Sequence, residues 1–241
     1  MLKKIALLSL FTVLAGCQTA GDQALTKQVQ ELTARLDKIE KIQTEIAQRS
    51  GMGALVRPER LEFADGHQIG DVKAKVAMLE FTDLQCPFCA KFQNEIWPTL
   101  KKEYVDTGKV LFIGRDNPLY QQHVQAPYAA LALKCAAKQD IYEPIKTYLL
   151  ANPGALEEEK IGEEFVKLKG DKVALKTCME DKELRKSIGV STQYAARLGV
   201  QSTPTFFIGK NETTHVSEYQ EVVGAKSVEE FRAVLDQLLA K

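Results

Sequence analysis

VAMLEFTDLQCPFC, residues 76–89, is the most informative stretch of this chain of 241 residues. Its mostly apolar first part predicts a strand, and its end places Cys86 and Cys89 where a helix should begin. Pro87 suits the first helical position, because a residue there needs no backbone N–H for a helical hydrogen bond. The free N–H groups and the dipole of a helix start favour a thiolate at Cys86. Such a thiolate can attack a disulfide and then be released by the thiol of Cys89.

Two cysteines at this spacing could also be half of a zinc site or a purely structural disulfide. A structural zinc site needs four ligands. The other cysteines, Cys17, Cys135 and Cys178, form no second CxxC pair, and the three histidines are scattered. A redox pair that opens a helix after a strand is therefore favoured. The sequence predicts no metal and no cofactor.

A second motif, GVQSTPTFFIG, occupies residues 199–209. It reads as a turn followed by an apolar strand with a proline at its start. The Thr203–Pro204 bond can adopt the cis form far more easily than a bond that lacks proline, and a cis proline in a fold usually has a specific role. The alternative is an ordinary proline that begins a strand.

Together, LEFTDLQCPFCAKF and GVQSTPTFFIG resemble the strand–CxxC–helix unit and the cis-proline strand of the DsbA-like thiol–disulfide oxidoreductases, in the thioredoxin superfamily. The resemblance implies an α/β thioredoxin fold over residues 57–241, with an inserted helical domain at about residues 125–186. We expect the helix after Cys89 to kink near Pro98, further strands near residues 110–113 and 222–224, and a closing helix over residues 228–239. Gly66 to Gly70 is expected to form a turn.

The resemblance also implies roles for single residues. Cys86 would be the exposed nucleophile and Cys89 the buried resolving thiol, while Thr203 and Pro204 would form a loop that binds an extended substrate segment. Glu80 lies six residues before Cys86, where relatives keep a buried acid that can take up the proton of the resolving thiol. The alternative for Glu80 is a strand carboxylate that faces solvent.

Pro87 and Phe88, between the two cysteines, are also expected to contact substrate. The best-known oxidase of the family has a histidine where this chain has Phe88. A histidine can stabilise the thiolate and make the disulfide strongly oxidising, whereas phenylalanine cannot. We therefore expect a higher pKa for Cys86 and a milder potential than in that oxidase. Thr203 before the proline also resembles the isomerases of this superfamily.

The N-terminus predicts export and lipid anchoring. Lys3 and Lys4 precede a short apolar run, as in a signal peptide, and the run is too short to span a membrane, which takes about 20 apolar residues. Residues 14–17, LAGC, resemble a bacterial lipobox, which implies removal of residues 1–16 and lipidation of Cys17. Gln18 favours the outer membrane, facing the periplasm. The alternative is an ordinary cleaved signal followed by an incidental cysteine.

Lipidation of Cys17 would leave four cysteines, an even set in an oxidising compartment. If Cys86 pairs with Cys89, then Cys135 and Cys178 remain for each other. Some DsbA relatives carry a second disulfide in the helical insertion. The alternative is two buried free thiols.

Residues 17–50 are expected to form an oligomerisation helix, followed by a hinge over residues 51–56. Between residues 22 and 50 the chain has no proline and no glycine, and apolar residues recur in steps of three and four, a coiled-coil pattern. The seam positions are Leu25, Val29, Leu32, Leu36, Ile39, Gln43 and Ile46. We expect a homodimer, with a trimer left open. The alternatives are a spacer above the membrane and a helix folded back on its own domain.

The chain carries 32 basic and 32 acidic residues, so its charge gives no reason to expect nucleic-acid binding. The sequence predicts a lipid-anchored enzyme that forms and isomerises disulfides in exported proteins, helped by a redox partner in the membrane. One alternative is a dedicated oxidase recycled by a quinone-linked membrane protein. Another, of a different class, is a lipid-anchored chaperone whose CxxC is structural.

Overall fold

The computed structural model describes residues 20–50, 57–63 and 65–241. The chain divides into two compact units, residues 1–46 and 47–241, which are described separately. The expected signal sequence, the lipidation site at Cys17 and the expected hinge at residues 51–56 lie outside the described residues. No helix within the described ranges is long and apolar enough to cross a membrane.

Helix α1 spans Ala20–Arg49. Its described large apolar side chains are about half exposed or more, which is unusual for a helix that has buried its apolar face. They are Val29, Leu32, Leu36, Ile39, Ile42 and Ile46, with exposed fractions from 46% to 64%. Five of these six stand at the seam positions that the heptad pattern marks.

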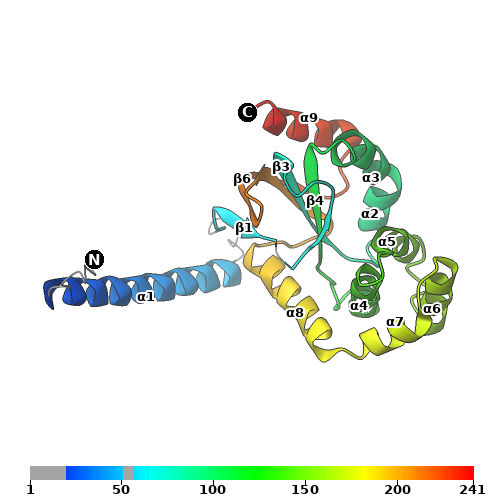
Figure 1. Cartoon of the computed structure of the whole chain (residues 1–241), viewed down its shortest axis with the longest axis horizontal. Coiled ribbons are helices and arrows are strands. Elements are labelled where there is room, and N and C mark those ends of the chain that lie inside the picture. Colours follow the sequence, from blue (N-terminus) through cyan, green and yellow to red (C-terminus); the bar gives the residue numbers. More distant parts are fainter. Residues whose placement is uncertain (1–19, 51–56, 64) are drawn as a thin grey trace, which may run out of the picture. The chain divides into compact units, whose positions relative to one another are not determined.

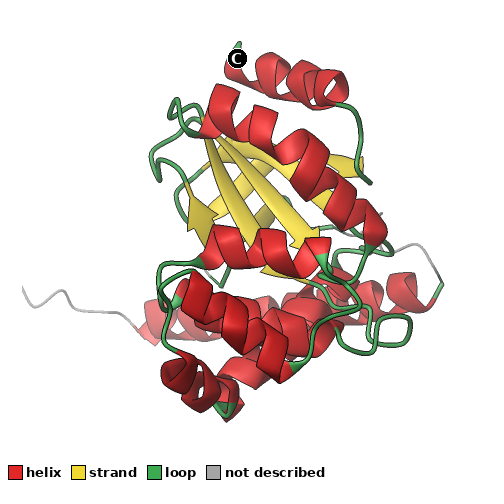
Figure 2. Cartoon of the chain, turned by 90° about the vertical axis from the view of Figure 1, so that its right-hand side faces the viewer, coloured by secondary structure: helices red, strands yellow, loops and turns green. Residues whose placement is uncertain are grey.

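The second unit is built on one six-stranded sheet in the order β1-β6-β5-β3-β4-β2 (Figure 2). At its centre, β3 (Val76–Thr82) pairs in parallel with β4 (Val110–Asp116), and all residues of both strands are buried. Strand β5 (Thr205–Asn211) pairs antiparallel with β3 and with β6 (His215–Val223), and β1 (Arg60–Glu62) lies beyond β6. The last expected strand therefore begins seven residues before Val222.

Helices cover both faces of this sheet, because buried side chains of β3 alternate between two cores. Val76 and Met78 pack with the helix that follows the CxxC motif and with α9 (Val228–Leu239). Ala77, Leu79 and Phe81 pack with the end of α8 (Lys182–Arg197) on the other face. Glu80 is in step with Met78, so it points to the face of the CxxC helix.

The helix after the CxxC motif widens twice into a π-helical turn. It runs through α2 (Pro87–Lys91), η2 (Phe92–Ile96), α3 (Trp97–Leu100) and η3 (Lys101–Val105), where η2 and η3 are π-helical turns. The first wide turn ends at Ile96, two residues before Pro98, which lacks the N–H that a regular α-helix would use there. The expected irregularity at Pro98 is thus present as a π-turn.

The helical insertion leaves the sheet after β4 and returns before β5. It contains α4 (Ala126–Ala137), α5 (Tyr142–Ala151), α6 (Glu158–Lys167) and α7 (Lys172–Met179), followed by α8. Figures 1 and 2 show α6 and α7 at the end of this unit opposite α9. Residue 186, where the insertion was expected to end, lies inside α8, which continues unbroken onto the sheet.

The prediction of a turn at Gly66–Gly70 is wrong, because the chain forms a short edge strand there. Strand β2 (His67–Ile69) pairs antiparallel with β4. The ring of His67 stacks on the ring of Tyr142 in α5, with centroids 3.7 Å apart. This contact joins residues far apart in the sequence, so no local pattern could reveal it.

Candidate active site

The two cysteines of the CxxC motif lie at the start of α2. Cys86 is the N-cap residue in an extended conformation, and Pro87 is the first helical residue. Both cysteines are free thiols. Cys86 is 6% exposed and Cys89 is fully buried. Cys86 is thus buried in this structure rather than exposed as expected, and the pair meets solvent only through the small exposed part of Cys86.

The cis-proline loop faces this helix start. The Thr203–Pro204 peptide bond is cis, and the Cys86 thiol donates a hydrogen bond of 3.3 Å to the backbone oxygen of Thr203. The sheet produces this contact, because β5 begins at Thr205 next to the end of β3, where Phe81 pairs with Thr205. The two motifs, separated by more than a hundred residues, thus meet at Cys86.

The two thiols differ in acidity. The pKa of Cys86 is lowered from 9.0 to about 5 by hydrogen bonds from the side chains of Cys89 and Thr203 and from the backbone N–H groups of Cys89 and Phe88, which together outweigh its burial. The pKa of Cys89 is raised well above 9.0 by its burial, by its hydrogen bond to Cys86, and by the charges of Cys86 and Glu80. Cys86 is therefore a thiolate at neutral pH, while Cys89 keeps its proton.

Glu80 is buried on β3, with 1% of its surface exposed, so it is not a strand carboxylate that faces solvent. Its negative charge is among the causes that raise the pKa of Cys89. Lys146 of α5 donates a 2.5 Å hydrogen bond to Glu80 Oε2, and this ammonium group is also buried. The sequence analysis missed Lys146, because it comes from the insertion, 66 residues beyond Glu80.

A second buried carboxylate, Asp83, fastens the active-site loop to the loop before α4. It accepts hydrogen bonds from the backbone N–H of Gln85 (2.7 Å) and of Leu119 (2.6 Å). Its Oδ2 also lies 2.9 Å from Nδ1 of His123. The backbone N–H of Asp83 points to Cys89 Sγ at 3.4 Å. The sequence analysis missed this network; the only signal was an acid three residues before Cys86.

Exposed apolar side chains stand on the active-site helix and on the loop that Asp83 holds. Phe88 is 62% exposed, and Tyr120 and Val124 are 59% and 81% exposed. Pro87 is also exposed, whereas Thr203 and Pro204 are buried.

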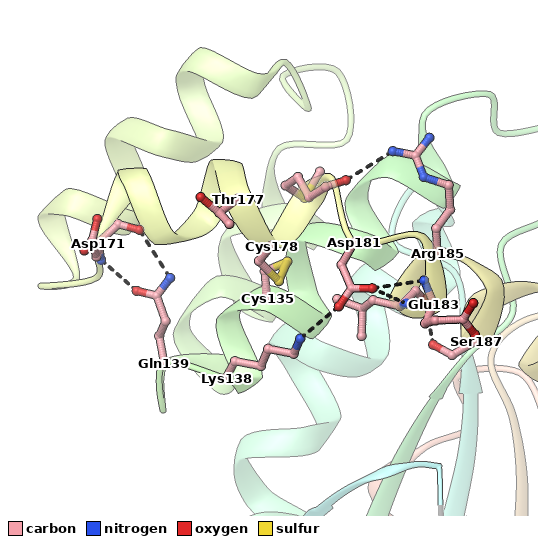
Figure 3. Close-up of a disulfide and its surroundings, with 12 residues drawn as sticks. Cys135, Lys138, Gln139, Asp171, Thr177, Cys178, Asp181, Glu183, Arg185 and Ser187 are labelled. Carbon is pink, nitrogen blue, oxygen red and sulfur yellow. Dashed lines mark hydrogen bonds and ion pairs between the residues drawn. A yellow bond between two sulfur atoms is a disulfide. The ribbon is translucent and has the colours of Figure 1, made fainter.

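A disulfide of 2.05 Å joins Cys135 of α4 to Cys178 of α7, across a sequence separation of 43 residues (Figure 3). Two further contacts link the same region of the insertion to the residues that directly follow α4. Gln139 exchanges hydrogen bonds with the backbone of Asp171, and Lys138 pairs with Asp181 at 3.4 Å. The disulfide thus cross-links two helices of the insertion, which contains no strand in the described residues. Within the described residues, no three His, Cys, Asp or Glu side chains are grouped so that they could hold a metal ion.

Comparisons with known proteins identify relatives for most of this chain. A "Probable disulfide bond formation protein D" of Bacillus anthracis is 28% identical over 169 residues, which are 64% of this chain and 74% of that protein. The "Na(+)/H(+) antiporter NhaA 3" of Salinispora tropica is 26% identical over 190 residues, and the chain spans 28% of that protein's length.

The crystal structure of alpha-DsbA1 from Wolbachia pipientis has a TM-score of 0.67 and 26% identity, covering 75% of this chain and 94% of that one. The family model described as "Thioredoxin" matches residues 63–237. This range contains the CxxC helix, the insertion and the cis-proline strand. The chain therefore belongs to the thioredoxin family, in the DsbA-like form in which helices are inserted into the thioredoxin fold.

Proposed function

We propose that this chain catalyses thiol–disulfide exchange in exported proteins, with Cys86 as the nucleophile and Cys89 as the resolving thiol. The observation that carries the proposal is the unequal acidity of the two thiols. Cys86, with a pKa of about 5, is ready to attack at neutral pH, whereas the buried Cys89 holds its proton until it is needed. A structural disulfide or an inert thiol pair requires no such difference.

In the oxidising direction, a substrate thiolate attacks Cys86 Sγ of the Cys86–Cys89 disulfide, and Cys89 leaves as a thiolate that takes up a proton. A second substrate thiolate then attacks the substrate sulfur of the mixed disulfide. The substrate leaves oxidised, and Cys86 leaves as the thiolate. Formation of the substrate disulfide transfers two electrons to the enzyme and leaves Cys86 and Cys89 reduced. An external oxidant must then re-oxidise these two cysteines.

The isomerising reaction starts from the reduced enzyme. The Cys86 thiolate attacks a wrong substrate disulfide, and either another substrate thiol or Cys89 resolves the mixed disulfide. We propose that the chain performs both reactions. A pKa of about 5 supports a mild redox couple, since it lies between the values of about 3.5 for a strong oxidase and about 7 for thioredoxin.

We further propose that α1 joins two copies of the chain. The exposed apolar residues of α1 follow the heptad positions of a two-stranded coiled coil. A dimer places two active sites at the disposal of one substrate and raises the effective concentration of attacking thiolate. A trimer made through the same seam would serve the same purpose.

The proposed location is the periplasmic side of the outer membrane, with the chain anchored through lipid on Cys17. The four cysteines beyond Cys17 support an oxidising compartment, because two of them form a disulfide outside the redox motif. The oxidant would be a membrane redox partner. The alternative function is that of a dedicated oxidase, and its membrane partner would be quinone-linked.

The test is the reactivation of ribonuclease with scrambled disulfides by the unlipidated protein, beside the oxidation of a reduced dithiol peptide. Wild type should perform both reactions, and Cys86→Ser neither. Oxidation without reactivation would indicate the dedicated oxidase. If Cys86 reacts with iodoacetamide no faster at neutral pH than an ordinary thiol, the redox proposal fails and the lipid-anchored chaperone gains support.

The oligomer proposal has its own test by light scattering. A chain that begins after Met52 should have the mass of one copy, while the chain that retains α1 should have the mass of two. Substitution of Leu32 and Ile39 by Lys should reduce the longer chain to one copy as well, since charges at the seam oppose association. Equal masses for the long and short chains would rule out α1 as the contact.

A further inference from the structure

The backbone of Asp83 contacts both cysteines of the redox pair. Its carbonyl oxygen accepts a 3.1 Å hydrogen bond from the backbone N–H of Cys86, and its own N–H donates to Cys89 Sγ at 3.4 Å. A hydrogen bond to sulfur is stronger when the sulfur carries a charge. This N–H is therefore placed to stabilise the Cys89 thiolate, which is the leaving group when a client attacks the Cys86–Cys89 disulfide.

The direction of this N–H is set by a residue outside the CxxC motif. The N–H of Asp83 and the carbonyl group of Thr82 belong to one planar trans peptide unit, so they point in opposite directions. The Thr82 oxygen accepts a 2.7 Å hydrogen bond from the backbone N–H of Asn117, which directly follows β4. This bond holds the carbonyl group away from Cys89 and the N–H towards it.

The side chain of Asp83 fixes the other end of the same unit. Its Oδ2 accepts the backbone N–H of Leu119 at 2.6 Å and lies 2.9 Å from Nδ1 of His123. A carboxylate oxygen only accepts, so Nδ1 is the donor in this contact. The backbone N–H of His123 also binds the carbonyl oxygen of Leu119 at 2.9 Å. These three hydrogen bonds close a ring around Oδ2.

His123 is the place where a side chain enters this arrangement. Three hydrogen bonds from residues 117–123 hold Thr82 and Asp83, and within the described residues the bond from His123 alone comes from a side chain. The Asp83 side chain is fully buried, whereas that of His123 is 21% exposed. A buried carboxylate depends on the donors that surround it, because solvent offers it no replacement. The imidazole is therefore part of what keeps Asp83 in position.

We propose that His123 is a positioning residue for the resolving cysteine, holding Asp83 so that its backbone N–H stays directed at Cys89 Sγ. The inference deepens the proposed function and rests on it, because this hydrogen bond acts when Cys89 is a thiolate. When a client thiolate attacks Cys86 Sγ, the new sulfur–sulfur bond forms as the Cys86–Cys89 bond breaks. The electron pair of the broken bond passes to Cys89 Sγ, where the Asp83 N–H meets the charge until the sulfur takes up a proton from solvent.

A purely structural role for His123 predicts the opposite change at Cys89. Burial is the first cause that raises the pKa of this thiol. If the loss of His123 only loosened the loop, water would reach Cys89 and its pKa would fall. The loss of a directed N–H donor removes a contact that favours the thiolate, so the pKa would rise. The sign of the change therefore separates the two roles.

The test titrates Cys89 alone, in the unlipidated protein with Cys17→Ser and Cys86→Ala. The ultraviolet absorbance of the thiolate then comes from Cys89, because the disulfide of the insertion does not titrate. His123→Gln should raise the pKa of Cys89 by about half a unit to one unit, which is the size expected for one lost hydrogen bond.

His123→Asn is the matched rescue. Asparagine and glutamine are both uncharged amides, but the amide nitrogen of asparagine lies two bonds from Cβ, as Nδ1 of histidine does, and that of glutamine lies three. His123→Asn should therefore keep the wild-type pKa of Cys89. His215→Gln is the control, because this histidine contacts Thr214 at the end of the sheet away from Cys86, and it should leave the pKa of Cys89 unchanged.

A second measurement needs no substitution at His123. In the protein with Cys86→Ala, the amide proton of Asp83 is followed by nuclear magnetic resonance as Cys89 is titrated. Its resonance should move downfield when the thiolate forms, because a hydrogen bond to a charged acceptor is stronger. A resonance that ignores the titration would overturn the inference, even if His123→Gln did not fold.

The remaining outcomes are equally decisive. An unchanged or lowered pKa of Cys89 in His123→Gln would overturn the inference. A raised pKa in His123→Asn would do so as well, since His123 would then act through its charge. In the protein with both cysteines, oxidised His123→Gln should react with a peptide thiol about twofold to threefold more slowly than wild type, because a less stable thiolate leaves more slowly.

The failure of the proposed function would look different. A wild-type protein that forms no mixed disulfide between Cys86 and the peptide thiol would refute thiol–disulfide exchange. The titration of Cys89 does not need that reaction, so it would still report whether His123 directs the Asp83 N–H.

Discussion

The stability of the reduced protein should depend on pH through Cys86. The pKa of this thiol is about 5 in the folded state, against 9.0 for an ordinary cysteine. A folded-state pKa that is lowered adds stability above it, where the folded state holds a thiolate and the unfolded state still holds a thiol. The contribution is complete above pH 9.0, partial at neutral pH, and lost as the pH falls through about 5.

The magnitude follows from the size of this window. Each pH unit between the two pKa values adds about 1.4 kcal/mol, so the reduced protein should gain about 2–3 kcal/mol between about pH 5 and about pH 7. The Cys86 side chain is nearly buried, so solvent screens this contribution little. The raised pKa of Cys89 acts in the opposite direction only at higher pH, outside this range.

The assay compares urea unfolding of the reduced and oxidised forms at each pH. The oxidised form has the same titratable groups except the two thiols, so the difference in free energy of unfolding isolates them. Cys86→Ser should follow the oxidised form in its pH dependence, while Cys89→Ala removes the side-chain hydrogen bond to the thiolate and should raise the pKa of Cys86. A difference between the two forms that stays constant over this range would refute the stabilised thiolate.

Three further outcomes are expected. Replacement of Cys135 and Cys178 together by Ala should lower the free energy of unfolding by about 2–4 kcal/mol, as expected for a disulfide that closes a loop of this length, and calorimetry measures it. Asp83→Ala should lower the free energy of unfolding by about 1–3 kcal/mol, because it leaves buried N–H groups without an acceptor. Hydrogen exchange at the amides of Gln85 and Leu119 should become faster, and unchanged exchange would contradict this role. Phe88→His should lower the pKa of Cys86 below about 5 and shift the equilibrium with glutathione towards the reduced enzyme, as absorbance titration and redox equilibration would show.

The two motifs were enough to predict the thioredoxin fold and the helices around it. Both are local patterns, since a strand that runs into a CxxC helix and a turn that runs into a proline strand can each be read within a dozen residues. The closing helix was predicted over residues 228–239, and the structure has it there, with a capping box between Ser227 and Glu230. In these segments the residue propensities, the capping residues and the burial pattern all favour the same secondary structure.

The partners of the buried acids could not be predicted. Lys146 meets Glu80, and His123 meets Asp83, across 66 and 40 residues of chain. Nothing in the neighbourhood of either acid marks the other member of the pair, because the insertion decides which side chains reach the sheet. Strand β2 escaped prediction for the same reason, since its pairing with β4 is what makes three residues a strand.

The small exposure of Cys86 has a consequence for the choice of clients. Only 6% of this residue meets solvent, beside the buried Thr203. In the proposed reaction the attacking sulfur must lie in line with the bond that it breaks, so a client would have to bring its disulfide to the nearly buried thiolate on an extended segment. A folded protein whose disulfides are packed within its own core would not reach this thiolate. In the proposed exchange reaction, the small exposure of Cys86 should therefore favour chains that are still folding over proteins that are already folded.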